Sequence, residues 1–222
     1  MSDVFAELDE VMRQEKLAKF WRENGTALII FVVMTVLVTA GISAYKAWDV
    51  KVRKTQTQEL LSLMDTPDFP ANLDLKALNL RPGLETIATL QAAGVLMKEG
   101  KQQDALPLYT SLAGDKSAPR EFRDLAILMA ARLRAAEANT PEEVAGLYES
   151  LSQVANNEKT PWRYHAHLDM AVLLADKQQN FEEARTHLAA VIKAEGLPTS
   201  LVSKAQALDH VYSLKHDKIK GE

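Results

Sequence analysis

The feature that most constrains this chain is a run of 22 residues without a charged side chain, from Asn24 to Tyr45. As a helix, this run would be about 33 Å long, which matches the hydrocarbon core of a bilayer at roughly 30 Å. An isolated segment can satisfy its backbone hydrogen bonds in lipid only as a helix. The sequence therefore predicts a transmembrane helix from Gly25 to Tyr45.

Aromatic side chains flank the run at both ends. Trp21 and Trp48 lie about 40 Å apart along a helix, close to the thickness of a bilayer with its headgroups. Because tryptophan favours this interface, we interpret both as interface anchors. Two alternatives stay open for the run, a buried core helix and a cleaved signal peptide. The 24 residues before Gly25 carry six acidic side chains, whereas the charged start of a signal peptide is normally short, which favours an uncleaved anchor.

Charge leaves the orientation of the span undecided. Four basic residues precede it and four follow it, so the positive-inside rule favours neither direction.

The chain has no cysteine, which excludes a disulfide framework, a cysteine-ligated zinc module and a thiol enzyme. Its formal net charge of -4 argues against nucleic acid as the main partner.

The chain divides into four regions. Residues 1–24 are predicted to form a short amphipathic helix that lies on the membrane surface, contacts a partner or is solvated. Residues 25–45 are the span. Residues 46–83 are a helical extension to about Met64 and a proline-containing linker, and residues 84–222 are helical repeats. The apolar stripe of the first helix consists of Val4, Leu8, Val11 and Met12.

Helix-breaking residues divide the repeat region into seven predicted helices. No useful length of sequence alternates between polar and apolar residues, so the expected fold class is all-α. Thr140 followed by Pro141 is typical of a helix start. Pro107 falls inside the second helix and predicts either a late start or a kink. The predicted helices cover residues 84–99, 101–113, 119–137, 141–154, 161–177, 180–194 and 199–216.

Three consecutive helix pairs share a register with spacings of 39 and 40 residues. Small residues are needed where two antiparallel helices cross, and larger ones fill the groove beside the crossing. A pair cannot bury both faces alone, so we expect the pairs to stack and the last one to need a cap. The equivalent positions are Ala92, Ala131 and Ala171; Ala105, Val144 and Ala184; Tyr109, Tyr148 and Leu188; and Leu112, Leu151 and Val191.

This pattern resembles the tetratricopeptide repeat. Its signature positions in the first pair are occupied by Ala93, Gly100, Ala105 and Tyr109. Later pairs depart from the signature, since Arg132 and Asn139 replace the first pair's small residue and turn glycine, and the period exceeds the usual value of about 34. The resemblance implies a solenoid of helical pairs with a C-terminal capping helix. The predicted capping face consists of Leu201, Ala205, Leu208, Val211 and Leu214.

The order of these features resembles a bacterial family of single-pass inner-membrane proteins that have a short cytoplasmic N-terminus and a periplasmic tetratricopeptide-like domain. Val4–Glu10 before the span, Lys19–Gly25 entering it and Tyr45–Trp48 leaving it carry the resemblance. Phe122–Ala126 and Thr160–Arg163 are similar to the alphaproteobacterial type. The resemblance implies a cytoplasmic N-terminus, an ancillary role at the Sec translocon and a link to periplasmic chaperones.

A search for chemical motifs predicts no catalytic residue, no cofactor and no metal site. The sequence contains no GxSxG, no HExxH, no phosphate-binding loop and no dinucleotide-binding glycine motif. His165 and His167 would point about 200° apart on a helix and could not chelate one ion. His187, His210 and His216 have no partner at ligand spacing. We therefore expect the histidines to be solvated or to cap helices.

Candidate partner-binding residues follow from the repeat register. The first helix of each pair lines the inner groove of such a solenoid, and the side chains predicted there are apolar. This groove would either bind an apolar segment of a partner or be filled by neighbouring units. Trp162 is either a core residue at a junction between pairs or a partner anchor. The predicted groove residues are Ile87, Leu90, Met97, Met129, Leu133 and Leu173.

These features favour a non-enzymatic, membrane-anchored protein-interaction module. From the resemblance, we expect an inner-membrane protein with periplasmic repeats, whose partners are translocon subunits, periplasmic chaperones or exported clients. Lipid surrounds the span, and homo-oligomerisation stays open. Three alternatives are an envelope-assembly or cell-division scaffold with the same topology, a cytoplasm-facing adaptor and an enzyme.

Overall fold

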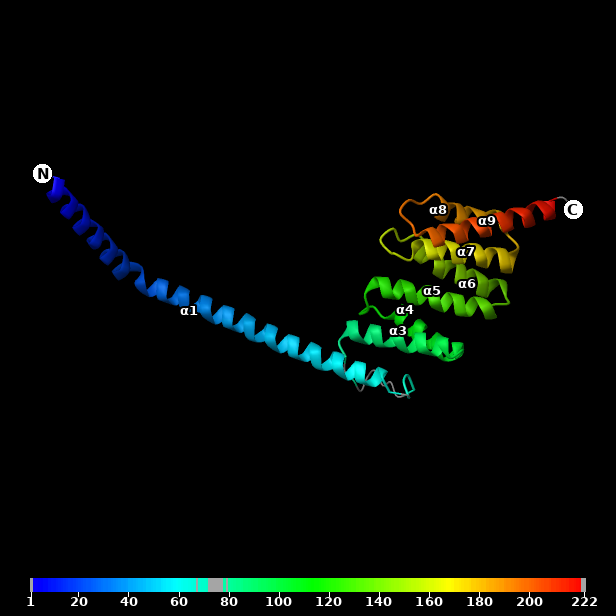
Figure 1. Cartoon of the computed structure of the whole chain (residues 1–222), viewed down its shortest axis with the longest axis horizontal. Coiled ribbons are helices and arrows are strands. Elements are labelled where there is room, and N and C mark those ends of the chain that lie inside the picture. Colours follow the sequence, from blue (N-terminus) through cyan, green and yellow to red (C-terminus); the bar gives the residue numbers. More distant parts are fainter. Residues whose placement is uncertain (1, 67, 72–77, 79, 221–222) are drawn as a thin grey trace. The chain divides into compact units, whose positions relative to one another are not determined.

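The computed structural model describes residues 2–66, 68–71, 78 and 80–220. Over these residues the regular structure consists of eight α-helices, with no strand, so the predicted all-α class is confirmed (Figure 1). The chain forms two compact units, Met1–Glu59 and Leu60–Glu222. Each unit is described in turn.

The first unit is one continuous helix, α1 (Ser2–Met64), whose last turn belongs to the second unit. It holds a segment near the N-terminus that is long and apolar enough to cross a membrane, and none of that segment is buried. Within the first unit this segment is therefore exposed, unlike the core helix of a soluble unit. The hydroxyls of Thr35 and Thr39 donate to the carbonyl oxygens of Phe31 and Thr35 at 2.8 and 2.7 Å. These polar groups are thus satisfied within the helix, as a segment in lipid requires.

The predicted interface anchors are exposed on α1. The Trp21 ring lies against Gly25, where an added Cβ would come within 3.0 Å of a ring carbon. At the other end, the rings of Tyr45 and Trp48 are 6.2 Å apart between centroids. Met12 is exposed. The side chains of Val4, Leu8 and Val11, the rest of the predicted amphipathic stripe, lie outside the described part of the chain.

Over its described residues, the second unit contains seven further helices, whose ends match the predicted segments to within four residues. Each helix packs against the next, and α5 also contacts α7, so neighbours in sequence are neighbours in space (Figure 1). The helices are α3 (Pro82–Lys98), α4 (Gln102–Gly114), α5 (Arg120–Glu137), α6 (Pro141–Ala155), α7 (Arg163–Gln178), α8 (Phe181–Ile192) and α9 (Thr199–Lys220).

Local chemistry explains where these helices begin and end. The hydroxyl of Thr140 accepts a hydrogen bond from the backbone N–H of Glu143, whose carboxylate accepts one from the N–H of Thr140. This reciprocal cap satisfies two donors that the first turn of α6 leaves free. Gly100 follows α3 with φ of 76°, a conformation that favours glycine. α4 begins at Gln102 and continues through Pro107, so the predicted late start is wrong.

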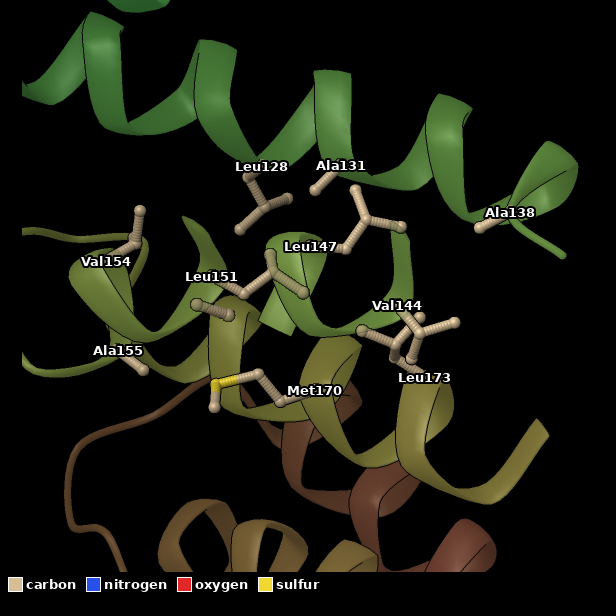
Figure 2. Packing of buried hydrophobic residues seen from close by; sticks show 11 residues of the cluster. Leu128, Ala131, Ala138, Val144, Leu147, Leu151, Val154, Ala155, Met170 and Leu173 are labelled. Carbon is tan, nitrogen blue, oxygen red and sulfur yellow. The ribbon is translucent and has the colours of Figure 1, made fainter. Parts of the chain in front are cut away.

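The twelve equivalent positions of the three predicted helix pairs, both small and large, contribute to the core of the second unit. All twelve are buried except Tyr148, which is partly buried. One cluster joins three successive helices, with Leu128 and Ala131 from α5, Leu151 from α6, and Met170 and Leu173 from α7 (Figure 2). The side chains point into the space between these helices, so each layer of the core depends on more than one helix pair.

The C-terminal helix α9, predicted as a cap, buries a different stripe from the predicted one. Val211 and Leu214 are exposed, at 44% and 59%, so their assignment to the buried face is wrong. Tyr212 takes their place, is buried and lies 5.8 Å from the ring of Phe181 between centroids. The stripe that packs on the last cluster is Leu201, Ala205, Leu208 and Tyr212, at regular helical spacing.

Candidate functional site

A hollow of the second unit lies where α5, α6 and α7 meet. Its volume is about 350 Å³, and it opens to solvent. Small and aliphatic side chains form its floor, because α5 presents alanine where it passes α7. The floor consists of Ala131, Ala135, Leu147, Leu151, Val172 and Leu173, and the exposed Ala136 lies beside it.

Charged side chains form the rim of this hollow. Arg132 Nε lies 2.7 Å from Asp169 Oδ2, which links α5 to α7. Burial raises the pKa of Asp169, and Arg132 opposes the rise. Lys177 Nζ donates to the carbonyl oxygen of Ala138 at 2.8 Å, and Asp176 completes the rim. The arrangement suits an apolar segment on the floor with polar contacts at the edge.

The predicted groove residues do not converge on this hollow. Leu173 is buried and contributes to it. Ile87 is exposed on α3. The other four pack against the cluster of α3, α4 and α5, which fills the space between those helices: Leu90, Met97, Met129 and Leu133. Sequence reasoning missed Arg132, Ala135, Asp169 and Val172, although Ala131 and Ala135 form a small-residue pair one turn apart on α5.

Trp162 lies at the junction between consecutive helix pairs. It is partly buried and packs against the cluster of α5, α6 and α7. Its indole N–H donates to the carbonyl oxygen of Glu121 at 2.8 Å, which links the start of α7 to the start of α5. The His165 ring meets it edge to face, with 5.6 Å between centroids. Trp162 therefore packs at the junction and also ties α7 to α5 through its indole N–H.

The predicted solvated role is wrong for three histidines. His165, His167 and His187 are partly buried in α7 and α8. The antiparallel return of the chain between these helices places His167 Nδ1 3.0 Å from His187 Nδ1. Burial lowers the pKa of His167 to about 4, and the neighbouring His187 and Arg163 add to the shift. Burial also lowers the pKa of His187.

Among the described residues, no group of three histidine, aspartate or glutamate side chains is placed to hold a metal ion. The hollow on α5, α6 and α7 is the candidate functional site, and the exposed apolar segment of α1 is a second candidate element.

Comparisons with protein-family models, with curated proteins and with solved structures find no match to this chain.

Proposed function

We propose that the chain is a non-enzymatic, membrane-anchored protein-interaction module. In this proposal α1 crosses the membrane once, α3–α8 form a tetratricopeptide-like solenoid and α9 caps it. The observation that carries the proposal is the apolar segment of α1, which is exposed in the described structure and continuous with the chain of the helical repeats. Buried small residues where the paired helices pack support the solenoid.

Tethering explains how a shallow hollow could still be effective. A module held at the membrane meets partners at that surface at a high effective concentration, so a weak contact is enough. The hollow on α5, α6 and α7 has a volume of about 350 Å³, an apolar floor and a charged rim. An apolar peptide segment would bury its side chains on the floor and pair its backbone at the rim.

The resemblance noted above supports a location beside the Sec translocon, with translocon subunits, periplasmic chaperones or exported clients as partners. It also supports a cytoplasmic N-terminus and periplasmic repeats. The competing proposals are a scaffold for envelope assembly or cell division with the same topology, and an inverted, cytoplasm-facing adaptor. Orientation and partner identity separate these proposals.

Reporter fusions test the orientation. Alkaline phosphatase, which requires an oxidising compartment, is fused after Glu222, and a fluorescent protein that matures only in the cytoplasm is fused there in a matched chain. We expect phosphatase activity and no fluorescence, because the proposed topology exports the repeats. The reverse pattern would overturn the export proposal and favour the inverted adaptor.

Site-specific crosslinking tests the hollow. A photoreactive residue replaces the exposed Ala136 on the hollow or, as the matched control, the exposed Gln206 on α9. We expect partner adducts from position 136 at several times the yield from position 206. Filling the floor with Ala135→Phe should remove the difference. Equal yields from both positions, or adducts that Ala135→Phe leaves unchanged, would contradict binding in the hollow.

The partners recovered in these adducts separate the remaining proposals. Translocon subunits, chaperones or exported clients would support the leading proposal, whereas envelope-assembly or division proteins would support the scaffold.

A further inference from the structure

Three helices of the second unit meet at a continuous chain of hydrogen-bonded side chains. Tyr148 on α6 lies 3.0 Å from Glu183 Oε1 and 3.2 Å from His187 Nε2, both on α8. His187 Nδ1 lies 3.0 Å from His167 Nδ1 on α7. The chain therefore joins α7 to α8 and both to α6.

The direction of each hydrogen bond follows from the carboxylate of Glu183, which ends the hydrogen-bonded series. The ionised carboxylate of Glu183 can only accept, so the Tyr148 hydroxyl donates to it. The Tyr148 oxygen then accepts from His187 Nε2–H. A neutral imidazole has one N–H, so His187 Nδ1 carries a lone pair and accepts from His167 Nδ1–H. This order requires a neutral His187, whereas His167 donates from Nδ1–H in both its neutral and its charged form.

Other side chains hold the carboxylate end in place. Asn180 Nδ2 donates to Glu183 Oε2 at 2.8 Å, and Asn180 Oδ1 accepts from the N–H of Glu183. Glu183 lies in the first turn of α8, where the helix dipole favours its negative charge.

The charged groups that act on the two rings lie on α7 and α8, whereas those of α5 and α9 act on other side chains. On α7, Arg163 disfavours a charge on His167, whereas Glu183 on α8 favours one on His187. Tyr148 is the titratable group that α6 presents to His187. On α9, Asp209 binds Arg185 of α8, and Lys204 acts on His165 and Asp169. On α5, Arg132 binds Asp169.

We propose that this series of hydrogen bonds is an acid-released latch that holds α8 and α9 against α6 and α7. A proton added to His187 Nδ1 converts the acceptor into a donor that faces the N–H of His167. Two N–H groups and one or two positive charges then face each other, and the contact between the rings is lost. α9 remains on α8 through Arg185 and Asp209, so the two helices open together. The latch depends only on contacts within α6–α9 and not on the proposed membrane role.

The titration of the rings has the sign that such a latch requires. Burial lowers the pKa of both histidines in the closed state, and that of His167 to about 4 from an ordinary 6.5. The open state therefore binds more protons, and the stability of the closed state is lost as the pH falls from 6.5 towards 4. For His167 alone, a pH of 5 favours opening by roughly thirtyfold relative to pH 7.5.

Hydrogen exchange of the full chain in lipid nanodiscs tests the latch. Opening of α8, corrected for the intrinsic effect of pH on exchange, should rise by at least about tenfold between pH 7.5 and 5. Opening of α3 and α4, which contain no histidine, should stay within about twofold. An α8 whose corrected opening is the same at both pH values would overturn the latch.

Paired variants assign the response to these two rings. The double variant His167→Gln and His187→Gln leaves no titrating imidazole in the hydrogen-bonded series, so its α8 opening should not respond to pH. The matched control is His165→Gln, which removes a partly buried histidine of the same helix that lies against Trp162. It should keep the full response. A response that survives the double variant, or one that His165→Gln abolishes, contradicts the latch.

A measurement on the unaltered chain covers the case in which the double variant fails to fold. Histidine labelled with ¹⁵N reports the tautomer of each ring by NMR in detergent micelles. At pH 7.5 we expect His187 to carry its proton on Nε2 and His167 on Nδ1. A proton on His187 Nδ1, or a charged His187 at this pH, would overturn the proposed order of hydrogen bonds.

Discussion

Replacing Val36 and Leu37 together by arginine is expected to release the chain from the membrane. Both residues lie near the middle of the apolar run and are exposed, at 60% and 61%. Arginine at the centre of a span costs about 2.5–3.5 kcal/mol on the insertion scale, whereas valine and leucine are slightly favourable. The double variant therefore shifts insertion by about 6–8 kcal/mol, which is large for a single span. The fraction of chain that pellets with membranes after alkaline carbonate measures the loss.

A control variant separates insertion from a general effect of added charge. Gln102→Arg with Gln103→Arg places the same two charges at the exposed start of α4. This variant should pellet like the parent chain, because it leaves the apolar run intact. Retention of the Val36→Arg, Leu37→Arg variant at the parent level would contradict a transmembrane role for α1, and so would release of the parent itself.

The helices could be predicted closely because the signals that start and stop them are local. The uncharged run, the cap at Thr140 and the turn at Gly100 act within a few residues of where they stand in the sequence. Spacing along the chain also identified the small positions where helices pack, such as Ala105 and Ala184, which are fully buried. These residues repeat because each pair meets the same steric requirement.

The open surface could not be predicted in the same way. Which face of a helix stays uncovered depends on the two helices that flank it, and the register contains no such information. The register predicts Met97 and Met129 in the groove, yet they pack between α3, α4 and α5. On α9, a shift of one residue around the helix exchanged Val211 for Tyr212 at the buried face.

The histidine pair shows the same limit for chemistry. His167 and His187 are 20 residues apart, which matches no ligand motif. The turn between α7 and α8 reverses the chain and brings the rings together. A sequence motif consists of residues that share one turn or one loop. The contact between His167 and His187 instead forms only when α7 and α8 pair.

The cluster between α5, α6 and α7 gives the second large expected effect, in Leu128→Ala. Leu128 is 1% exposed and lies among Leu151, Met170 and other side chains of three helices (Figure 2). Its truncation leaves a cavity that well-packed neighbours cannot fill, so the free energy of unfolding should fall by about 3 kcal/mol. Denaturant unfolding of the full chain in detergent, followed through Trp162 fluorescence against a Trp162→Phe blank, measures the change.

Leu214→Ala on α9 removes the same atoms from a side chain that is 59% exposed, and it should change the free energy of unfolding by less than about 0.5 kcal/mol. The comparison tests the helical stack as well as the single site, because Leu128 touches more than one pair. If the pairs fold as one cooperative unit, Leu128→Ala lowers the single transition of the whole second unit. A separate early transition of α3–α5, or equal losses in both variants, would contradict a core shared between consecutive pairs.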